Sequence, residues 1–222
     1  MKLVAVNIDG VLLPDSFSPV IYRFVVGRGL AYTAELERSV LSQSQMAAAQ
    51  VLGLGDPEVV VREFFREREA YVREHPVRVV AGAEALLGRL RSLGVKLVCY
   101  GGLRREHFDR YLGHCAELFD GPGYVCTDGF RPGVREIAED VFGLECERAL
   151  FIDDVARVAE AARERGAAFI GHPSSFEHSF QRELMAQAGV RHLVDSLEAI
   201  DERLLEVVDA EAAAGRLWSP AA

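Results

Sequence analysis

The chain has 222 residues, half of them hydrophobic, and a formal net charge of -9 at pH 7. This composition predicts a globular protein with a sizeable core, and the acidic excess argues against a general nucleic-acid-binding surface. No apolar run approaches the roughly 20 residues of a membrane-spanning helix, and the short, acid-interrupted amino-terminal run is unlike a secretory signal. We expect a cytoplasmic protein with no nucleic-acid or membrane partner, and free thiols at its four widely spaced cysteines.

The first predicted element is a buried strand at the start of residues 2–13, where a short apolar run leads into Asn7, Asp9 and Gly10. Helices are predicted over 18–26, with Ser18 as N-cap, over 33–52, and from Asp56-Pro57 to the mid-seventies. No strand signal occurs between about 18 and 75, so residues 16–76 are expected to form a helical insertion. We expect its aromatic residues to serve mainly in packing, although one or two of Tyr22, Phe24, Phe64, Phe65 and Tyr71 could cover a site.

From residue 77 the pattern alternates between strands and helices. Strands are predicted over 95–100, 123–126, 149–152 and 167–170, and helices over 83–93, 104–112, 134–142 and 155–165. A short strand over 190–194, a helix over 196–213 and a frayed end over 216–222 complete the chain. This alternation predicts an α/β fold with a doubly wound parallel sheet, formed by residues 1–15 and 77–222, and a site at the carboxyl ends of the strands.

The residues at these strand ends resemble the motifs of the haloacid-dehalogenase-like (HAD-like) hydrolases, over about residues 2–205. Asn7, Asp9 and Gly10 resemble the first motif, Asp-x-Asp-Gly, and Leu150 to Asp154 resembles the fourth. The resemblance implies a Rossmann-like core, an all-helical cap at 16–76, and transfer of a phosphoryl group to the first aspartate with Mg²⁺ as cofactor. Asp9 matches the general acid/base of the family, but Asn7 holds the position of the nucleophile. A neutral amide is a weak nucleophile and a poor ligand for a hard cation.

The other motifs match in part. Gly101 stands where the family has a phosphate-binding Ser or Thr, although the N–H groups of Gly101 and Gly102 can still bind an anion. Arg131, before Pro132, stands for the family's lysine and keeps its charge. Asp153 and Asp154, with Asp9, match the Mg²⁺ ligands of the family. Many relatives carry a further acid four residues after the first, and Arg157 holds that position here. Five of the histidines show no spacing typical of a catalytic or metal site, and we expect each to be a surface or core residue: His107, His114, His172, His178 and His192.

Three hypotheses follow. The first is a non-catalytic or redirected phosphatase homologue that binds a small phosphorylated ligand or a protein partner, because both the nucleophile and the phosphate-binding hydroxyl are missing. The second is a Mg²⁺-dependent phosphohydrolase of small phosphate esters in which Asp9 or Asp153 activates water. The third is that Asn7 was introduced to trap a substrate, but Gly101, a second departure, counts against it. We favour the first.

Overall fold

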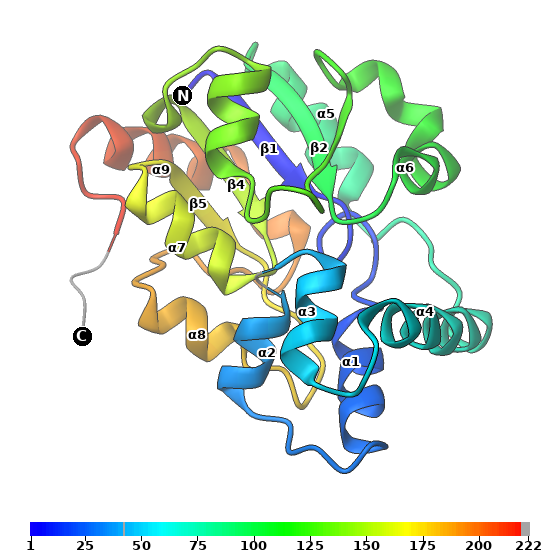
Figure 1. Ribbon diagram of the computed structural model, residues 1–222. Helices are drawn as coiled ribbons and strands as arrows, with labels where there is room; N and C mark the ends of the chain where they lie inside the picture. Colours follow the sequence, from blue (N-terminus) through cyan, green and yellow to red (C-terminus); the bar gives the residue numbers. More distant parts are fainter. Residues whose placement is uncertain (42, 219–222) are drawn as a thin grey trace.

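The computed structural model describes residues 1–41 and 43–218 and has the predicted α/β architecture (Figure 1). Five parallel strands form one sheet in the order β3-β2-β1-β4-β5. These are β1 (Leu3–Asn7), β2 (Lys96–Gly101), β3 (Tyr124–Cys126), β4 (Ala149–Asp153) and β5 (Ala168–Gly171). The chain places β2 and β3 on one side of the central strand β1 and later places β4 and β5 on the other side. The carboxyl ends of β1, β2 and β4 therefore meet where the strand order reverses, and a doubly wound sheet forms its binding crevice at that point.

Each strand of the sheet contributes alternate side chains to two separate cores. Val4 and Val6 of β1 belong to one buried cluster, whereas Leu3 and Ala5 belong to the other. This alternation follows from the two-residue period of a strand, and it makes both faces of the sheet apolar, as a parallel sheet requires. All four cysteines are free thiols, as expected.

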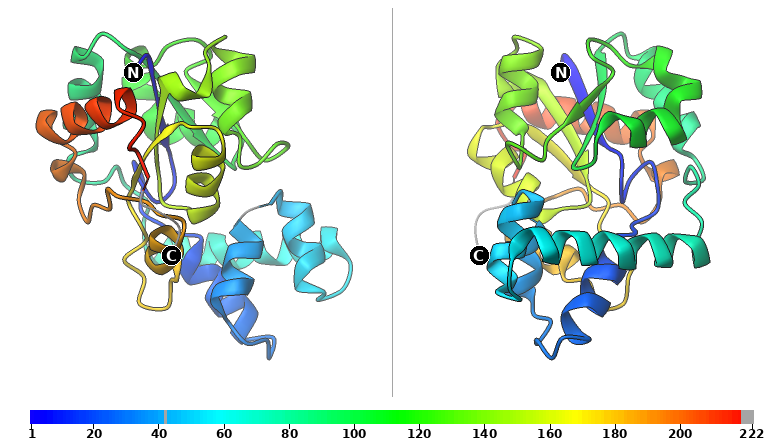
Figure 2. Two further views of the ribbon diagram at one scale, coloured as in Figure 1. Left: turned by 90° about the vertical axis from the view of Figure 1, so that its left-hand side faces the viewer. Right: turned by 45° about the vertical axis from the view of Figure 1, so that its right-hand side comes forward.

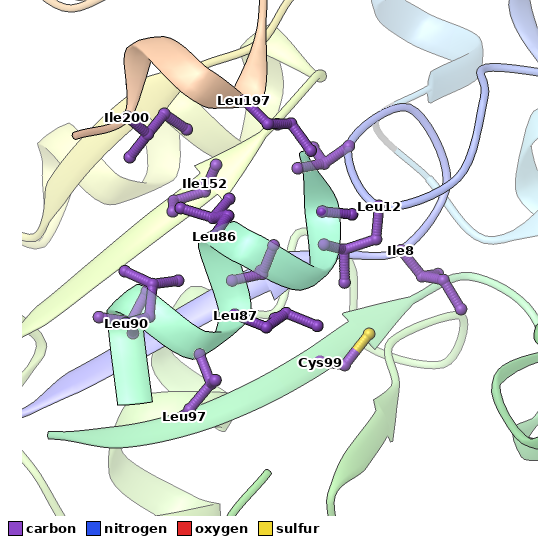
Figure 3. Close-up of a cluster of buried hydrophobic side chains, with 14 of the residues drawn as sticks. Ile8, Leu12, Leu86, Leu87, Leu90, Leu97, Cys99, Ile152, Leu197 and Ile200 are labelled. Carbon is purple, nitrogen blue, oxygen red and sulfur yellow. The ribbon is translucent and has the colours of Figure 1, made fainter. Parts of the chain in front are cut away.

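Helices cover both faces of the sheet (Figure 2). The first core receives side chains from α5 (Ala83–Ser92), α6 (Arg105–Leu112) and α9 (Glu202–Ala213), and Figure 3 shows Leu86, Leu87 and Leu90 of α5 beside Leu97 and Ile152 of the sheet. The second core receives them from the π-helical turn η2 (Glu136–Val141), α7 (Ala156–Glu164) and α8 (Gln181–Gln187). Short 3-10 turns, η1 (Gly113–Leu118), η3 (Cys146–Arg148) and η4 (Leu197–Ala199), connect these elements. No described helix combines the length and the apolar character needed to cross a membrane.

Four of the described helices lie between β1 and α5 in the chain, and we call them the α1–α4 segment. They are α1 (Ser18–Val26), α2 (Ala34–Leu41), α3 (Gln45–Leu52) and α4 (Pro57–Glu74). Figures 1 and 2 show them grouped together beyond the carboxyl ends of the strands. They have small apolar clusters of their own, one of them built from Phe24, Ala49 and Val60. The segment therefore lies over the sheet edge where the site was predicted.

Two predicted helices are each divided in the structure. The predicted helix over 33–52 becomes α2 and α3, because the Ser44 side chain accepts a hydrogen bond from the Ala47 N–H and starts a new helix. In the same way the Asp201 side chain accepts from the Leu204 N–H, so the predicted helix over 196–213 is η4 followed by α9.

Three smaller expectations were also wrong or cannot be judged. Residues 190–194 form only isolated bridges, including Gly171 with Leu193. Ser18 does not cap α1, because the Asp15 carboxylate accepts hydrogen bonds from the Phe17 and Ser18 N–H groups instead. The fraying expected over 216–222 does not begin at 216, because Trp218 pairs with Val190 and stacks on Phe169; residues 219–222 lie outside the described part of the chain.

Candidate functional site

Asn7 ends β1, and both the nitrogen and the oxygen of its side-chain amide form hydrogen bonds within the protein. Its Nδ2 donates to the Asp9 carbonyl oxygen at 3.0 Å and to Asp154 Oδ1 at 2.8 Å. Its Oδ1 accepts from the Ile8 N–H at 2.9 Å. Both amide protons are therefore used within the protein, and a donor group faces Asp154 where the related motif would place a second carboxylate. The residue is buried, and the amide acts here as a structural hydrogen-bonding group.

Asp9 lies two residues further on, and two side chains from distant parts of the chain approach it. His107 of α6 places its Nε2 2.9 Å from Asp9 Oδ1, and Arg68 of α4 places its Nη2 3.8 Å from the same oxygen. Arg68 also donates two hydrogen bonds to Ser16 Oγ and lies over the Phe17 ring, 4.4 Å from its centroid. The charge of Asp9 is thus balanced by a guanidinium from the α1–α4 segment.

Asp153 and Asp154 end β4 as a buried pair of carboxyl groups. Asp153 accepts hydrogen bonds from the Val155 N–H at 2.7 Å and from the Tyr100 hydroxyl. Burial raises the pKa of Asp153 to about 6. Burial, and after it the charge of Asp153, raises the pKa of Asp154 well above its usual range. The pair therefore retains protons at a pH where exposed aspartates are fully ionised.

The donor set formed by Asp9, Asp153 and Asp154 does not fit Mg²⁺. Among the described residues no three or more His, Cys, Asp or Glu side chains are grouped so that they could hold a metal ion. Oxygens of all three carboxyl groups already face protein N–H or O–H donors or a cationic side chain, whereas Mg²⁺ requires free, charged oxygen ligands in near-octahedral geometry.

Gly101 ends β2 and Gly102 follows it, and both are packed so closely that neither could carry a side chain without movement. A Cβ atom on Gly101 would lie 2.5 Å from Ile8 Cγ2, and one on Gly102 would lie 2.2 Å from Arg131 Nη2. Gly102 thus gives room to the guanidinium of Arg131, which also donates to the Leu41 carbonyl at 3.2 Å. The hydroxyl expected at residue 101 is missing, and the space it would need is filled by Ile8.

A cavity lies between the α1–α4 segment and the strand ends, with a volume of about 970 Å³ including its open mouth. Five of the predicted site residues line it: Asn7, Asp9, Gly102, Arg131 and Asp154. The other two, Gly101 and Asp153, line a smaller space of about 290 Å³ that shares Asn7 and Arg131. All seven predicted residues therefore gather around the end of β1.

Sequence reasoning missed several residues at this site. Arg68 and His107 contact Asp9, although His107 had been expected to lie elsewhere in the surface or core. Asp15 and Asp128 line the large cavity. Asp128 follows the end of β3, so the rule that strand ends gather at one edge could have identified it. Nothing in the local sequence around Arg68 signals its contact, which depends on how α4 packs.

The cavity also shows where the segment's aromatic residues lie. Phe24, Phe64 and Phe65 line it, and Phe17 joins them from the loop before α1, whereas Tyr22 and Tyr71 are not part of its lining. Phe24 and Phe64 also pack edge to face, with ring centroids 5.6 Å apart. The same rings therefore serve both in packing and in lining the cavity.

Comparison with solved structures confirms the fold. No family model and no curated protein matches the chain. A β-phosphoglucomutase from Clostridium difficile matches with a TM-score of 0.68 and 13% identity over 96% of this chain and 99% of that one. A HAD hydrolase, family IA, variant 3, from Entamoeba histolytica matches with a TM-score of 0.66 and 14% identity over 94% and 100%. A HAD family hydrolase from Deinococcus radiodurans R1, solved with bound phosphate and sodium, matches with a TM-score of 0.59 and 21% identity over 100% and 99%. The described part of the chain therefore has the HAD-like fold.

Proposed function

We propose that this protein is a phosphatase homologue that binds a small ligand in the cavity over Asn7 and does not turn over phosphate esters through an aspartyl-phosphate. Residues 16–76 act as a helical cap over that cavity, on a core of residues 1–15 and 77–222. The single observation that carries the proposal is the set of hydrogen bonds made by the Asn7 amide.

The role of Asn7 follows from those contacts. A nucleophile at this position would need a free, charged oxygen directed toward the substrate. The Asn7 oxygen instead accepts from the Ile8 N–H, and its nitrogen donates to Asp154. The residue therefore stabilises the strand end and the buried acid beside it, and no covalent intermediate forms there.

The remaining positions support the same conclusion. Asp9, the general acid/base of the resembled motif, is engaged by His107 and Arg68. The position of the phosphate-binding hydroxyl is Gly101, and Ile8 fills the neighbouring space. Each departure from the family motif is matched by the residues packed around it. This supports a site that binds a ligand without transferring a phosphoryl group.

A small ligand is favoured over a protein partner because the site is a cavity and not a flat surface. Concave sites with apolar walls and a few convergent polar groups are typical of small-molecule binding, and this cavity has an apolar lining with polar residues at its base.

Turnover assays test this proposal. The wild-type chain, Asn7→Asp and Asp9→Ala are incubated with a panel of small phosphate esters at millimolar Mg²⁺, and released phosphate is measured. We expect no turnover by the wild type. Turnover by the wild type that Asp9→Ala abolishes would overturn the proposal and support the Mg²⁺-dependent phosphohydrolase instead. Activity that appears only in Asn7→Asp would assign the loss to residue 7 alone.

A further inference from the structure

The α1–α4 segment is packed around apolar cores of its own. Its two clusters of buried apolar side chains draw their buried members only from α1, α2, α3 and α4, whereas the two larger clusters lie on the faces of the sheet. Figure 2 shows the segment grouped beyond the strand ends, and the chain joins it to the sheet through residues 8–17 and 75–82. A unit of this kind can move relative to the sheet without losing its internal packing, provided that the contacts across the boundary open.

Glu37 of α2 makes a fully buried contact across this boundary. Its carboxylate accepts hydrogen bonds from Ser179 Oγ at 3.0 Å, from the Phe180 N–H at 3.0 Å and from Gln181 Nε2 at 2.7 Å. All three donors are neutral, and they lie at the start of α8 or directly before it. Closing the segment removes water from the carboxylate and replaces that water with these donors. The two effects largely offset each other, so the contact is one that can open and close.

Gln181 connects Glu37 to the end of β4. Its side chain is buried, and its Oε1 accepts a hydrogen bond from the Ala156 N–H at 2.7 Å while its Nε2 donates to Glu37. Ala156 is the first residue of α7 and follows Asp154 by two positions. Both ends of one amide are therefore engaged, and its orientation is fixed. A single side chain joins the segment to the strand end beneath the cavity.

The loop before α8 also holds the segment through aromatic rings. Tyr22 of α1 stacks on His178 with ring centroids 4.1 Å apart and meets Phe176 edge to face at 5.6 Å. Tyr32, between α1 and α2, lies 6.1 Å from Phe180. Residues 176–181 therefore contact α1, α2 and the chain between them.

A second polar contact holds the segment at the cavity itself. Gln45, the first residue of α3, donates from its N–H to Asp128 Oδ1 at 2.9 Å and from its Nε2 to the Gly102 carbonyl at 3.0 Å. Gln45, Asp128 and Gly102 all line the cavity, whereas Glu37 does not. The two contacts are made by different helices with different parts of the core. If the segment moves as one body, however, they must open in the same event.

We propose that Glu37 and Gln181 form a latch that holds the α1–α4 segment closed over the cavity, and that the segment opens as one unit when this hydrogen bond breaks. The inference goes beyond the proposed function, because it concerns access to the cavity and depends neither on the ligand nor on turnover. Gln181 acts as a positioning residue that joins closure of the segment to the start of α7.

Amide hydrogen exchange of the full chain, measured by NMR at pH 7, tests the proposal. The N–H groups of Gln45 and Phe180 donate across the boundary, so both exchange when the segment opens. We expect the two amides to share one protection factor, at least about tenfold lower than that of the amides in β1 and β4. A Gln45 protection factor equal to that of the sheet would mean that the contact opens only on global unfolding, and it would overturn the proposal.

Gln181→Glu opens the latch selectively. The variant keeps an oxygen for the Ala156 N–H and replaces Nε2, which lies 2.7 Å from Glu37 Oε1, with a second acceptor. Loss of this hydrogen bond and the added repulsion should lower the protection of the Gln45 and Phe180 amides together, by at least about tenfold. Unchanged protection of Gln45 would show that Gln45 opens independently of the latch, and it would refute opening as one unit.

The double variant with Glu37→Gln restores a donor opposite the new carboxylate. We expect it to return the protection of Gln45 to within about threefold of the wild type, and failure to do so would count against a direct Glu37–Gln181 latch. Ser179→Ala removes one donor to Glu37 and should lower the same protection factor, which keeps the test decisive if Gln181→Glu does not fold. Gln187→Glu is the matched control, because Gln187 is an exposed residue of the same helix, and it should change neither amide.

Discussion

Asn7→Asp is the substitution whose effect on stability follows most directly from the structure. It removes the N–H donors to Asp154 Oδ1 and to the Asp9 carbonyl. At about 1.5–3 kcal/mol for the hydrogen bond to a buried acid and about 1 kcal/mol for the other, the loss is roughly 2.5–4 kcal/mol. The new carboxylate also faces an oxygen that is now 2.8 Å from the amide nitrogen, which adds repulsion.

Together these terms predict that the free energy of unfolding falls by about 3–5 kcal/mol in EDTA at pH 8, equivalent to a fall of roughly 10 °C in melting temperature for a chain of this size. The repulsive part should shrink as the pH is lowered. A carboxyl group with a raised pKa in the folded state contributes stability when protonated and loses that contribution as the pH rises through its pKa.

Mg²⁺ distinguishes this explanation from simple damage to the fold. In Asn7→Asp a third carboxylate joins Asp9 and Asp154, so millimolar Mg²⁺ should restore part of the stability, by about 2–3 kcal/mol at a hundred times its dissociation constant. Asn7→Ala loses the same donors without adding a ligand, and Mg²⁺ should not restore it. The assay is urea unfolding of both variants and the wild type, with EDTA and with Mg²⁺. The reasoning is refuted if Asn7→Asp in EDTA is as stable as the wild type, or if Mg²⁺ stabilises the wild type equally.

Two further substitutions test other contacts by the same unfolding assay. Glu37→Ala should lower the free energy of unfolding by about 3–4 kcal/mol, because Glu37 is fully buried and accepts hydrogen bonds from Gln181 Nε2 and two other donors. The matched control is Glu35→Ala, since Glu35 is exposed. Equal effects of the two substitutions would contradict the explanation. Gly101→Ser should cost about 1–3 kcal/mol, since its Cβ would lie 2.5 Å from Ile8 Cγ2. The double variant with Ile8→Ala should cost less than the sum of the single changes, so strict additivity would be evidence against the clash.

Much of the sheet could be predicted from the sequence, because each described strand except β3 is a short apolar run that ends at a glycine, an acid or an amide. The positions of Asn7, Gly101 and Asp153 at one edge followed from the parallel order alone. The helix boundaries were harder. Between residues 33 and 52 the helical spacing of apolar residues continues across the break between α2 and α3. That spacing predicted one continuous helix, although Ser44 is a local signal for the start of a second helix.

The residues around Asp9 could not be predicted in this way. Arg68 and His107 reach it from α4 and α6, and their positions depend on how those helices pack. The metal-site expectation depends on contacts of the same kind. The sequence provides three acids at the right strand ends, but hydrogen bonds from Asn7 and Tyr100 decide whether their oxygens are free.

The contacts that join the α1–α4 segment to the rest of the protein bear on how quickly a ligand could exchange. Glu37 accepts hydrogen bonds from the loop before α8, Gln45 donates to the Gly102 carbonyl, and Arg38 forms a salt bridge with Glu160 of α7. The cavity beneath this segment can widen only when such contacts open together, a motion on the timescale of microseconds or longer. A ligand too large for the open mouth would therefore exchange no faster than that motion allows.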